Sequence, residues 1–293
     1  MTRRILTVQG LGEKASWLLV QQALGMPDSK LQTDFMTQRV ALLAFARHSL
    51  PERLCVSAAI RQMGGAVVYE GTRGMWHTEM SEYQEHLLPI FSYYVDCLYT
   101  YGIPVAFWGA KAGGTDFPII NAGSPDAHPA HALADIACML RSSRDLEKVT
   151  CAWLGCANGT LHSLMAATAW FPFRMRIAVP PQTDTAPLEE AAAKFGTSIV
   201  FVKNPEEAVR GASHVFAGCS KDLTAGDRAT WKLDAGILSN AGQDVRIMLS
   251  ASPVTAIPVD REILSSRASL LTLQSEYRLR IHKRMLHWVF LDA

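Results

Sequence analysis

The second half of the chain alternates short apolar runs with amphipathic segments, and this alternation constrains the fold more than any other feature. The runs VTCAWLG, MRIAVP, SIVFV, HVFAGC and VRIMLSA each have the length of a buried strand. Helical segments such as ANGTLHSLMAATAWF and PLEEAAAKFG lie between them, and residues 204–207 supply an N-cap asparagine, a first-turn proline and two first-turn acids. Alternating strands and helices predict a parallel sheet that is covered on both faces.

The first half is less regular, and its elements are predicted from apolar spacing and from breakers. We predict helices over LGEKASWLLVQQALGM and DFMTQRVALLAFARHS, a third that follows Leu50 and ends at Gly64, and a fourth over 82–94. AVVYEG, VDCLYTYG and FPIIN are predicted strands, and IPVAFWGAKAGGTD is predicted to be a strand followed by a loop. The fold class is therefore α/β throughout.

The chain of 293 residues is long enough for two domains of about 100–150 residues each. The charged stretch RSSRDLEK has no apolar pattern, so we expect the domain boundary beside it. The expected domains are residues 1–140 and 141–270. An amphipathic helix in the last segment, 271–293, is expected to pack back on the first domain.

Composition excludes several classes of function. The net charge of +1 provides no strong field for nucleic acid or for an anionic membrane surface. The chain has no apolar run of the roughly 18–20 residues that a membrane span needs, and its basic start lacks the apolar stretch of a signal peptide, so we expect a cytoplasmic protein. The six cysteines include no C-x-x-C pair and are expected to be reduced. The turn GCANG is not G-x-G-x-x-G, and no cofactor is expected.

Residues 117–135, FPIINAGSPDAHPAHALAD, are the most distinctive stretch for function. A helix is predicted to start at His128 and Pro129, which places His128, His131 and Asp135 on one helix face. Two imidazoles near a helix start are well placed to meet an anion or a carbonyl oxygen. For His131 the alternative is a simple pairing with Asp135. A metal site would need further converging ligands, and none is evident, so the prediction is no metal.

This stretch resembles the H-P-x-Q-x-L-x-D motif of the aspartate/ornithine carbamoyltransferase family, with His131 at the position of the glutamine. Five further segments resemble family motifs in the same order: FARHSLPERLCVSAAIRQMGG, YYVDCLYTY, GCANGTLHSLM, KNPEEAVRGASHVF and LQSEYRLRIHKRML. The resemblance implies two domains, each a parallel sheet flanked by helices, with the active-site cleft between them. It also implies a homotrimer, and the aromatic run 91–94 is predicted to be core or subunit contact.

Matching letter by letter, the resemblance implies a set of site residues. His128, which in the family contacts the carbonyl group of carbamoyl phosphate, and Arg53 of the phosphate-binding motif are the implied catalytic residues. The implied substrate-binding residues are Ser49, Tyr101, His131, Asn158, Ser250 and Arg278.

Several family letters are absent. Pro51 stands at one arginine of the phosphate motif, Tyr101 at a second arginine at a strand end, and Glu52 at a threonine. Proline and tyrosine cannot replace a bidentate arginine on a phosphate dianion. We expect these changes to remove about 4–7 kcal/mol, or roughly three to five orders of magnitude in affinity. By their positions in loops, Arg47, Arg73 and Lys111 are candidates to replace the missing arginines in binding the phosphate.

Three functions remain open at this point. The first is a divergent amino-acid carbamoyltransferase that binds an amino acid or amine together with carbamoyl phosphate or a related anion. The second is an inactive protein of the same fold that serves in binding or assembly. The third is an enzyme with a repurposed cleft for a less anionic substrate, lined by Glu52, Tyr101, His128 and His131.

Overall fold

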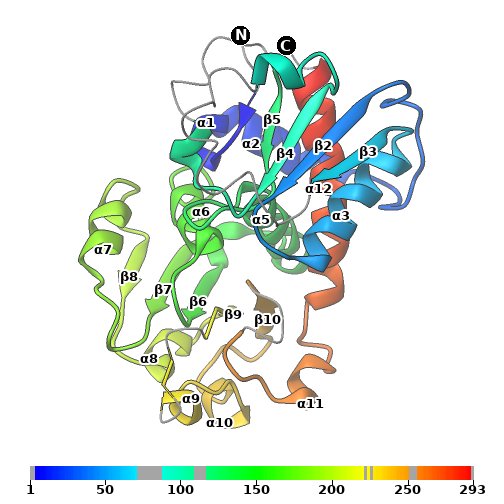
Figure 1. The fold of residues 1–293 in the computed structure, drawn as a ribbon. Helices are drawn as coiled ribbons and strands as arrows, with labels where there is room; N and C mark the ends of the chain where they lie inside the picture. The colour runs from blue at the N-terminus through cyan, green and yellow to red at the C-terminus, as the bar shows by residue number, and fades with distance from the viewer. Residues whose placement is uncertain are drawn as a thin grey trace. The chain divides into compact units, whose positions relative to one another are not determined.

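The computed structural model describes residues 4–70, 88–108, 117–220, 223–224, 227–250 and 256–291 (Figure 1). The chain divides into two compact units. Unit 1 comprises Met1–Ala134 and Glu276–Ala293, and unit 2 comprises Asp135–Ser275. Each unit holds one five-stranded parallel sheet flanked by helices, which confirms the predicted fold class. Of the helices in the described ranges, none combines the length and apolar character that crossing a bilayer requires.

Unit 1 has the sheet order β1-β5-β4-β2-β3. Its strands are β1 (Arg4–Ile5), β2 (Val40–Phe45), β3 (Ala66–Glu70), β4 (Cys97–Tyr101) and β5 (Ile119–Asn121). Its helices are α1 (Val8–Leu11), α2 (Glu13–Leu24), α3 (Leu50–Gln62), the 3₁₀ turn η1 (Val105–Trp108), the start of α5 (Pro129–Ser143) and most of α12 (Leu271–Leu291).

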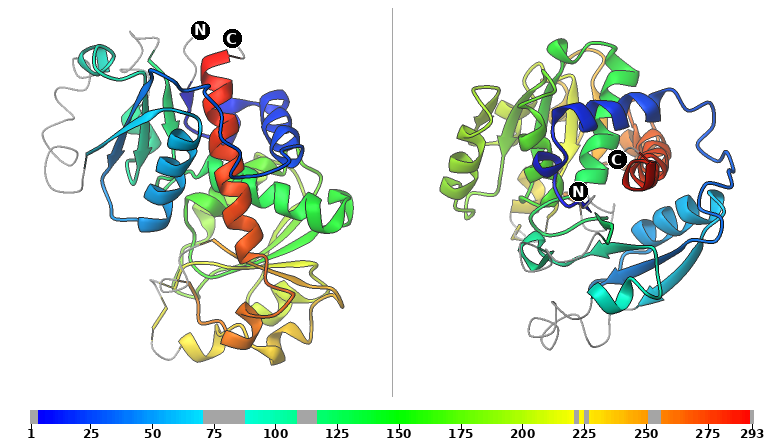
Figure 2. Two further views of the ribbon diagram at one scale, coloured as in Figure 1. Left: turned by 90° about the vertical axis from the view of Figure 1, so that its right-hand side faces the viewer. Right: turned by 90° about the horizontal axis from the view of Figure 1, so that it is seen from above.

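Both faces of the unit 1 sheet are buried at the strands β2 and β4. Leu42 and Leu98 are buried on one face, and Leu43 and Tyr99 on the other, as the two-residue period of a strand requires. In the right panel of Figure 2, α12 is seen end-on and α2 lengthwise, so the two helices cross. Arg280 on α12 fixes this pairing, because its guanidinium donates to the main-chain oxygen of Ala23 at the end of α2.

The predicted helix over 34–49 is wrong. Residues Val40–Phe45 form β2, the strand that pairs with both β3 and β4. The run VALLAF is apolar at every position because both faces of the strand are covered, and such a run has no period that separates strand from helix. The strand predicted after Ile103 is also wrong in its described part, which forms the 3₁₀ turn η1; residues 109–116 lie outside the described ranges.

Unit 2 has the sheet order β10-β9-β6-β7-β8. Its strands are β6 (Thr150–Leu154), β7 (Arg174–Ala178), β8 (Ile199–Phe201), β9 (His214–Ala217) and β10 (Arg246–Leu249), each overlapping one of the five predicted runs. Its helices are the rest of α5, η3 (Leu146–Lys148), α6 (Gly159–Ala167), α7 (Ala186–Ala193), α8 (Pro205–Val209), α9 (Asp227–Thr230), α10 (Ala235–Leu238) and α11 (Arg261–Leu264).

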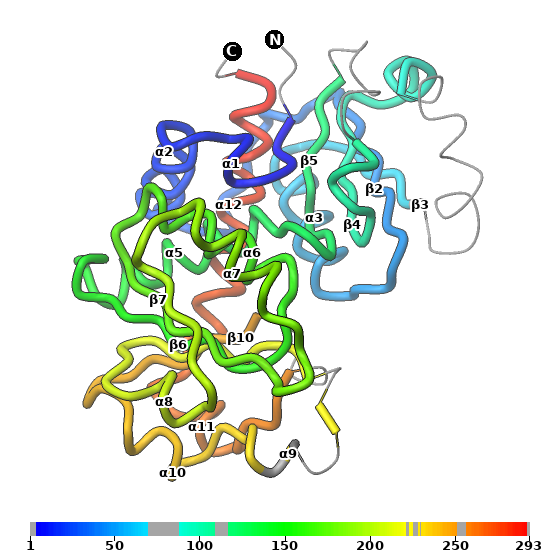
Figure 3. Tube along the Cα trace, turned by 90° about the vertical axis from the view of Figure 1, so that its left-hand side faces the viewer, coloured from blue at the N-terminus to red at the C-terminus, as the bar shows by residue number. Residues whose placement is uncertain are grey.

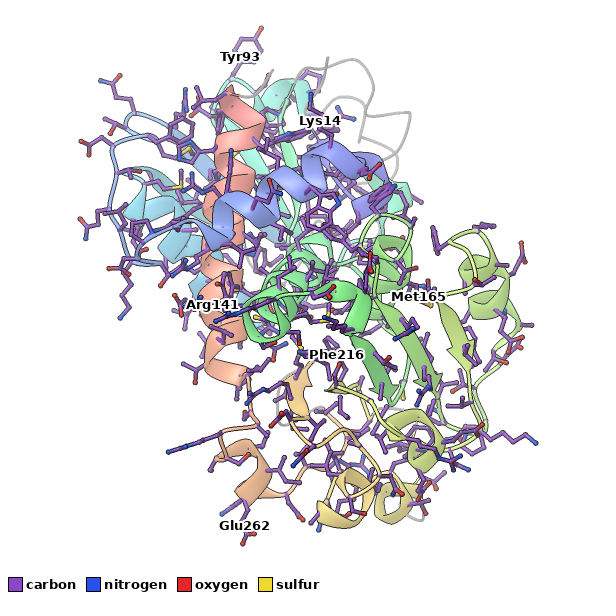
Figure 4. All side chains as sticks on the ribbon, turned by 180° about the vertical axis from the view of Figure 1, so that it is seen from behind. Lys14, Tyr93, Arg141, Met165, Phe216 and Glu262 are labelled. Carbon is purple, nitrogen blue, oxygen red and sulfur yellow. The ribbon has the colours of Figure 1, made fainter. Side chains whose placement is uncertain are left out.

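The unit 2 sheet is likewise a middle layer. Ala152 and Leu154 face a core completed by residues of α8 and α10, while Trp153 stacks on Phe216 on the opposite face. The trace in Figure 3 shows α8 beside β6 and β7. Figure 4 labels the buried Phe216 and the exposed Glu262 of α11. The predicted helix start at Asn204 is confirmed, because its Oδ1 accepts from the amide of Glu207 at 2.9 Å.

Candidate active site

The loop between β5 and α5 is fixed by the side chain of Asn121, the last residue of β5. Its Nδ2 donates to Ser124 Oγ at 3.1 Å and to the main-chain oxygen of Ala127 at 3.2 Å. Its Oδ1 accepts from the amide of Gly123 at 2.9 Å. One buried amide therefore satisfies the polar groups of the loop and sets His128 directly ahead of the first turn of α5.

Gly123 permits the close approach of two aromatic rings to this loop. Its φ is +139°, and a Cβ atom there would lie 2.5 Å from His128 Nε2 and 2.9 Å from Tyr101 Cε2. Both contacts are shorter than carbon and nitrogen atoms tolerate, so the packing of His128 and Tyr101 against the loop requires glycine.

His128, His131 and Glu52 form a buried cluster. The imidazole rings of His128 and His131 stack with centroids 3.5 Å apart and planes inclined by 17°. Glu52, on the first turn of α3, is 7% exposed, and its carboxylate oxygens lie 3.1 Å from His131 Nε2. Each of the three side chains offers one metal-ligating atom, and these atoms lie within 4.8 Å of one another.

Burial keeps both histidines neutral. Desolvation lowers the pKa of His128 well below its usual value, and the neighbouring His131 lowers it further. Desolvation also lowers the pKa of His131, assisted by the positive charge of Arg278. We therefore describe the contact with Glu52 as a carboxylate that accepts the Nε2–H of a neutral imidazole.

Tyr101, at the end of β4, connects the phosphate-motif segment to His128. It makes a side-chain hydrogen bond with Ser49, and its ring packs edge-on to His128 with centroids 6.5 Å apart. Burial and the charge of Glu52 raise the pKa of Tyr101, so the hydroxyl stays protonated. Ser49 is the N-cap residue of α3 by position, but its side chain makes no capping hydrogen bond.

The arginines of unit 1 lie around this cluster in different ways. Arg53 is half-buried, with its guanidinium carbon 4.9 Å from the centroid of the Tyr69 ring. Arg278 of α12 acts electrostatically on both His128 and His131. The exposed Arg47 lies across Gly102 and lowers the pKa of Tyr101. Arg73 and Lys111 lie outside the described residues.

In unit 2, the carboxyl ends of β6 and β10 bring two predicted residues together. Asn158 is the N-cap of α6, where its Oδ1 accepts from the amides of Thr160 and Leu161 at 2.9 and 3.1 Å. Its Nδ2 donates to Ser250 Oγ at 3.4 Å. Ser250 in turn donates to the main-chain oxygen of Ala217 at 3.4 Å.

Asp135 is not the partner of His131, which corrects the alternative that the helix spacing suggested. Its Oδ1 accepts from Gln274 Nε2 at 2.7 Å, and Gln274 also bonds both main-chain groups of Leu249. The partner of His131 is Glu52, 79 positions earlier in the chain. Helix periodicity relates residues of one helix and carries no information about a partner on another element.

Sequence reasoning missed one further residue of the cluster. His282 of α12 is 0% exposed, and neither ring nitrogen has a hydrogen-bond partner. Its position contributes to lowering the pKa values of both His128 and His131. The available signal was its spacing, because His282 follows Arg278 by one helical turn and shares its face.

Unit 1 thus gathers Ser49, Tyr101, His128 and His131 around Glu52, with Arg278 within electrostatic reach. A neutral imidazole held by a rigid loop can donate a hydrogen bond to a carbonyl oxygen or to an oxyanion. Position 51, directly before Glu52, holds a proline, and the carboxylate of Glu52 opposes a second anion at the same place.

Comparison with known proteins supports a common origin for this arrangement. Residues 3–141 match the family model of the aspartate/ornithine carbamoyltransferase carbamoyl-P binding domain, and residues 147–289 match that of the Asp/Orn binding domain. The ornithine carbamoyltransferase of Nitratidesulfovibrio vulgaris (strain DP4) is 26% identical over 301 residues, covering 100% of both chains. That of Bacillus subtilis is 25% identical, covering 96% of this chain and 92% of its own.

Solved structures show the same fold. The ornithine carbamoyltransferase from Thermus thermophilus matches with a TM-score of 0.86 at 22% identity, covering 99% of each chain. The ornithine transcarbamoylase from Giardia lamblia matches with a TM-score of 0.82 at 19% identity, covering 100% of this chain and 99% of its own. With both family models matched across nearly the whole chain, the protein belongs to the aspartate/ornithine carbamoyltransferase family.

Proposed function

We propose that the protein is a divergent carbamoyltransferase that moves a carbamoyl group from an activated donor to an amine. The observation that carries this proposal is the position of His128. It is buried, neutral and packed on Gly123, at the helix start that the family's motif occupies.

In this reaction the nitrogen of a neutral amine attacks the carbonyl carbon. The new N–C bond forms, the bond from carbon to the leaving oxygen breaks, and the amine loses a proton to the departing oxyanion or to water. His128 Nδ1 faces the amide of His131, so Nε2 carries the proton and can donate to the developing oxyanion. Positioning supplies most of the rate, and no covalent intermediate with the protein is needed.

Unit 2 would hold the acceptor. Its matched family model is described as an Asp/Orn binding domain, and Asn158 with Ser250 lies at the carboxyl ends of its strands. Parallel α/β sheets bind ligands at that edge. Because the Oδ1 of Asn158 is used in capping α6, its Nδ2 is the group that remains to donate to an amino-acid carboxylate.

The donor is expected to be bound more weakly than in relatives that keep the full phosphate motif. Glu52 places a carboxylate on the first turn of α3, and Tyr101 fills a strand end where the resembled motif has an arginine. We infer that carbamoyl phosphate binds in the millimolar range, or that the natural donor has a less anionic leaving group.

Two measurements test the proposal together. Calorimetric titration with carbamoyl phosphate up to millimolar concentration reports donor binding. A mass-spectrometric assay with a panel of amino acids and diamines reports the carbamoylated product. The proposal expects a product whose formation falls about 100-fold or more in His128→Ala, as loss of one oxyanion donor predicts. Donor binding or turnover that is equal in wild type and His128→Ala would refute the role of His128.

A second candidate function is binding without catalysis, and the buried Glu52–His131 pair is the observation that favours it. A paired carboxylate in a phosphate motif is a stable structural arrangement rather than an anion site. This candidate predicts no product with any amine tested, together with a rise in melting temperature when the true ligand is added.

A homotrimer is proposed separately. Its support is a set of exposed apolar side chains on α3, at the edge strand β3 and in the 91–94 run: Leu50, Leu54, Val68, Tyr93 and Tyr94. Sedimentation or light scattering of the purified protein would give the mass of the assembly, and a monomeric mass at micromolar concentration would exclude it.

A further inference from the structure

The cluster of Glu52, His128 and His131 has a composition that neither a hydrogen-bond network nor a phosphate site requires. Its three side chains come from two separate elements, α3 and the start of α5, and each is less than 9% exposed. Their ligating atoms lie within 4.8 Å of one another. Two imidazoles and one carboxylate are the donor set of many three-ligand zinc sites.

We propose that Glu52, His128 and His131 form a binding site for a divalent transition-metal ion of the zinc class. The inference does not rest on the proposed transferase activity. It rests on the convergence of three such donors in the interior of unit 1.

The polar atoms of His131 support this assignment. Its Nε2 contacts the carboxylate of Glu52, while its Nδ1 is buried without a hydrogen-bond partner. A proton that moves from Nε2 to Nδ1 leaves an Nε2 lone pair directed to the carboxylate region, which is the form that binds a metal. In the metal-bound form His128 no longer donates through Nε2. It gives up the 3.4 Å contact between its Nδ1 and the amide of His131, carries its proton on Nδ1 and offers the Nε2 lone pair to the ion.

A bound ion would also neutralise the buried negative charge of Glu52. Without it, the carboxylate of Glu52 is 7% exposed and its contact is the imidazole of His131. With it, the cluster becomes positively charged, and one or more coordination positions stay open to an oxygen ligand such as a carbonyl or phosphate oxygen. Imidazole and carboxylate ligands favour zinc, nickel and copper over magnesium or calcium, which prefer oxygen-only sites.

The test measures metal binding directly. The full-length protein is stripped with a chelator, and Zn²⁺ is titrated in by calorimetry. Co²⁺ serves as a second probe, because its visible absorption reports the coordination geometry. The proposal expects one Zn²⁺ per chain, and an affinity that falls at least about 100-fold in both Glu52→Gln and His131→Gln. It also expects Zn²⁺ to raise the melting temperature of the wild type.

His48→Gln is the matched control, because His48 is an exposed histidine of the same unit. It should keep the wild-type affinity. Circular dichroism identifies a variant that fails to fold. For such a variant, the Zn²⁺ stoichiometry of the wild type and its Co²⁺ spectrum decide whether the site exists. Less than stoichiometric binding by the wild type, or equal affinity in wild type, Glu52→Gln and His131→Gln, would overturn the site. None of these measurements depends on catalytic turnover. The metal site can therefore be tested even if the protein is inactive in the transferase assay.

Discussion

Among single residues, the departures from the carbamoyltransferase motif are in contact with one another. Glu52 and His131 are both departures, and their side-chain atoms lie 3.1 Å apart in the interior. A buried carboxylate without a partner is strongly destabilising, so neither residue is expected to be tolerated well without the other. We therefore expect Glu52 and His131 to be energetically coupled.

This coupling can be measured with a double-mutant cycle. His131→Leu leaves the Glu52 carboxylate buried and without its imidazole, so we expect a loss of about 3–5 kcal/mol in the free energy of unfolding. Glu52→Leu/His131→Leu should cost less than the sum of the single changes by about 1–3 kcal/mol. Urea unfolding of the four proteins gives the coupling. Additive effects would show that the two groups do not depend on each other.

His214 on β9 gives a prediction for pH dependence. It is 0% exposed, its ring nitrogens lie 3.0 Å from Ser142 Oγ and 3.1 Å from Ser213 Oγ, and burial lowers its pKa from 6.5 to about 4. The unfolded chain therefore binds a proton between pH 6.5 and 4 that the folded chain does not. The contribution of His214 to the free energy of unfolding is complete above pH 6.5. It falls by up to about 3 kcal/mol as the pH drops toward 4.

The check is the free energy of unfolding at several pH values for wild type and His214→Gln. The variant loses some stability at neutral pH, because the amide fits the two serines less well. Its curve should be flatter between pH 6.5 and 4 by the amount assigned to His214. Parallel curves for the two proteins would assign the acid sensitivity to other groups.

Among the elements, Gln274 connects three parts of unit 2. From the first turn of α12 it accepts from the amide of Leu249 at 3.0 Å, donates to the carbonyl of Leu249 at 3.1 Å, and donates to Asp135 on α5. Gln274→Ala removes these three buried hydrogen bonds, so we expect a loss of about 3 kcal/mol in the free energy of unfolding. Gln21→Ala on the exposed face of α2 should change it by less than about 0.5 kcal/mol. A small effect of Gln274→Ala would mean that water replaces the side chain.

Asn158 allows the capping of α6 to be separated from ligand binding. Asn158→Ala removes the acceptor for the amides of Thr160 and Leu161 and should cost about 1 kcal/mol of stability. Asn158→Asp keeps the acceptor and should retain the stability, but it places a negative charge where an amino-acid carboxylate is proposed to bind. Thermal melts check the first effect. Weaker amino-acid binding in Asn158→Asp at unchanged stability checks the second.

The sequence predicted elements where local signals are strong and failed where tertiary burial decides. Asn204 and the residues that follow it predicted the start of α8 through an N-cap, a proline and first-turn acids. VALLAF was misread because a strand buried on both faces has no alternation. Helices α9, α10 and α11 were missed, since helices of four residues are too short to show a period.

The same division applies to the candidate site. Motif order assigned Ser49, Tyr101 and His128 to one predicted site. Spacing did not predict the contacts of Tyr101 with Ser49 and His128. The Glu52–His131 contact joins two elements 79 positions apart, and His282 joins the cluster from the last helix. Such contacts follow from the packing of helices on a sheet, which no local pattern encodes.

For the molecule as a whole, fold and chemistry depend on different parts of the sequence. The TM-score of 0.86 at 22% identity shows that the fold is shared although most residues differ. We propose that anion binding depends instead on the residues at positions 51, 52, 101 and 131. If the scaffold is otherwise competent, returning those letters should return the affinity.

The last prediction tests this directly with the variant Pro51→Arg/Glu52→Thr/Tyr101→Arg/His131→Gln. Two restored guanidinium groups and the loss of one carboxylate should strengthen carbamoyl phosphate binding by about 1000-fold, since each charge-assisted hydrogen bond contributes about 1.5–3 kcal/mol. A control with glutamine at 51 and 101 keeps the size and removes the charge, and it should gain little. Calorimetry with the same ligand measures all three proteins. The arginine variant could fold and still bind carbamoyl phosphate no better than the control. The cations would then be present without the geometry that makes them bidentate, and positions beyond the motif would set the anion affinity.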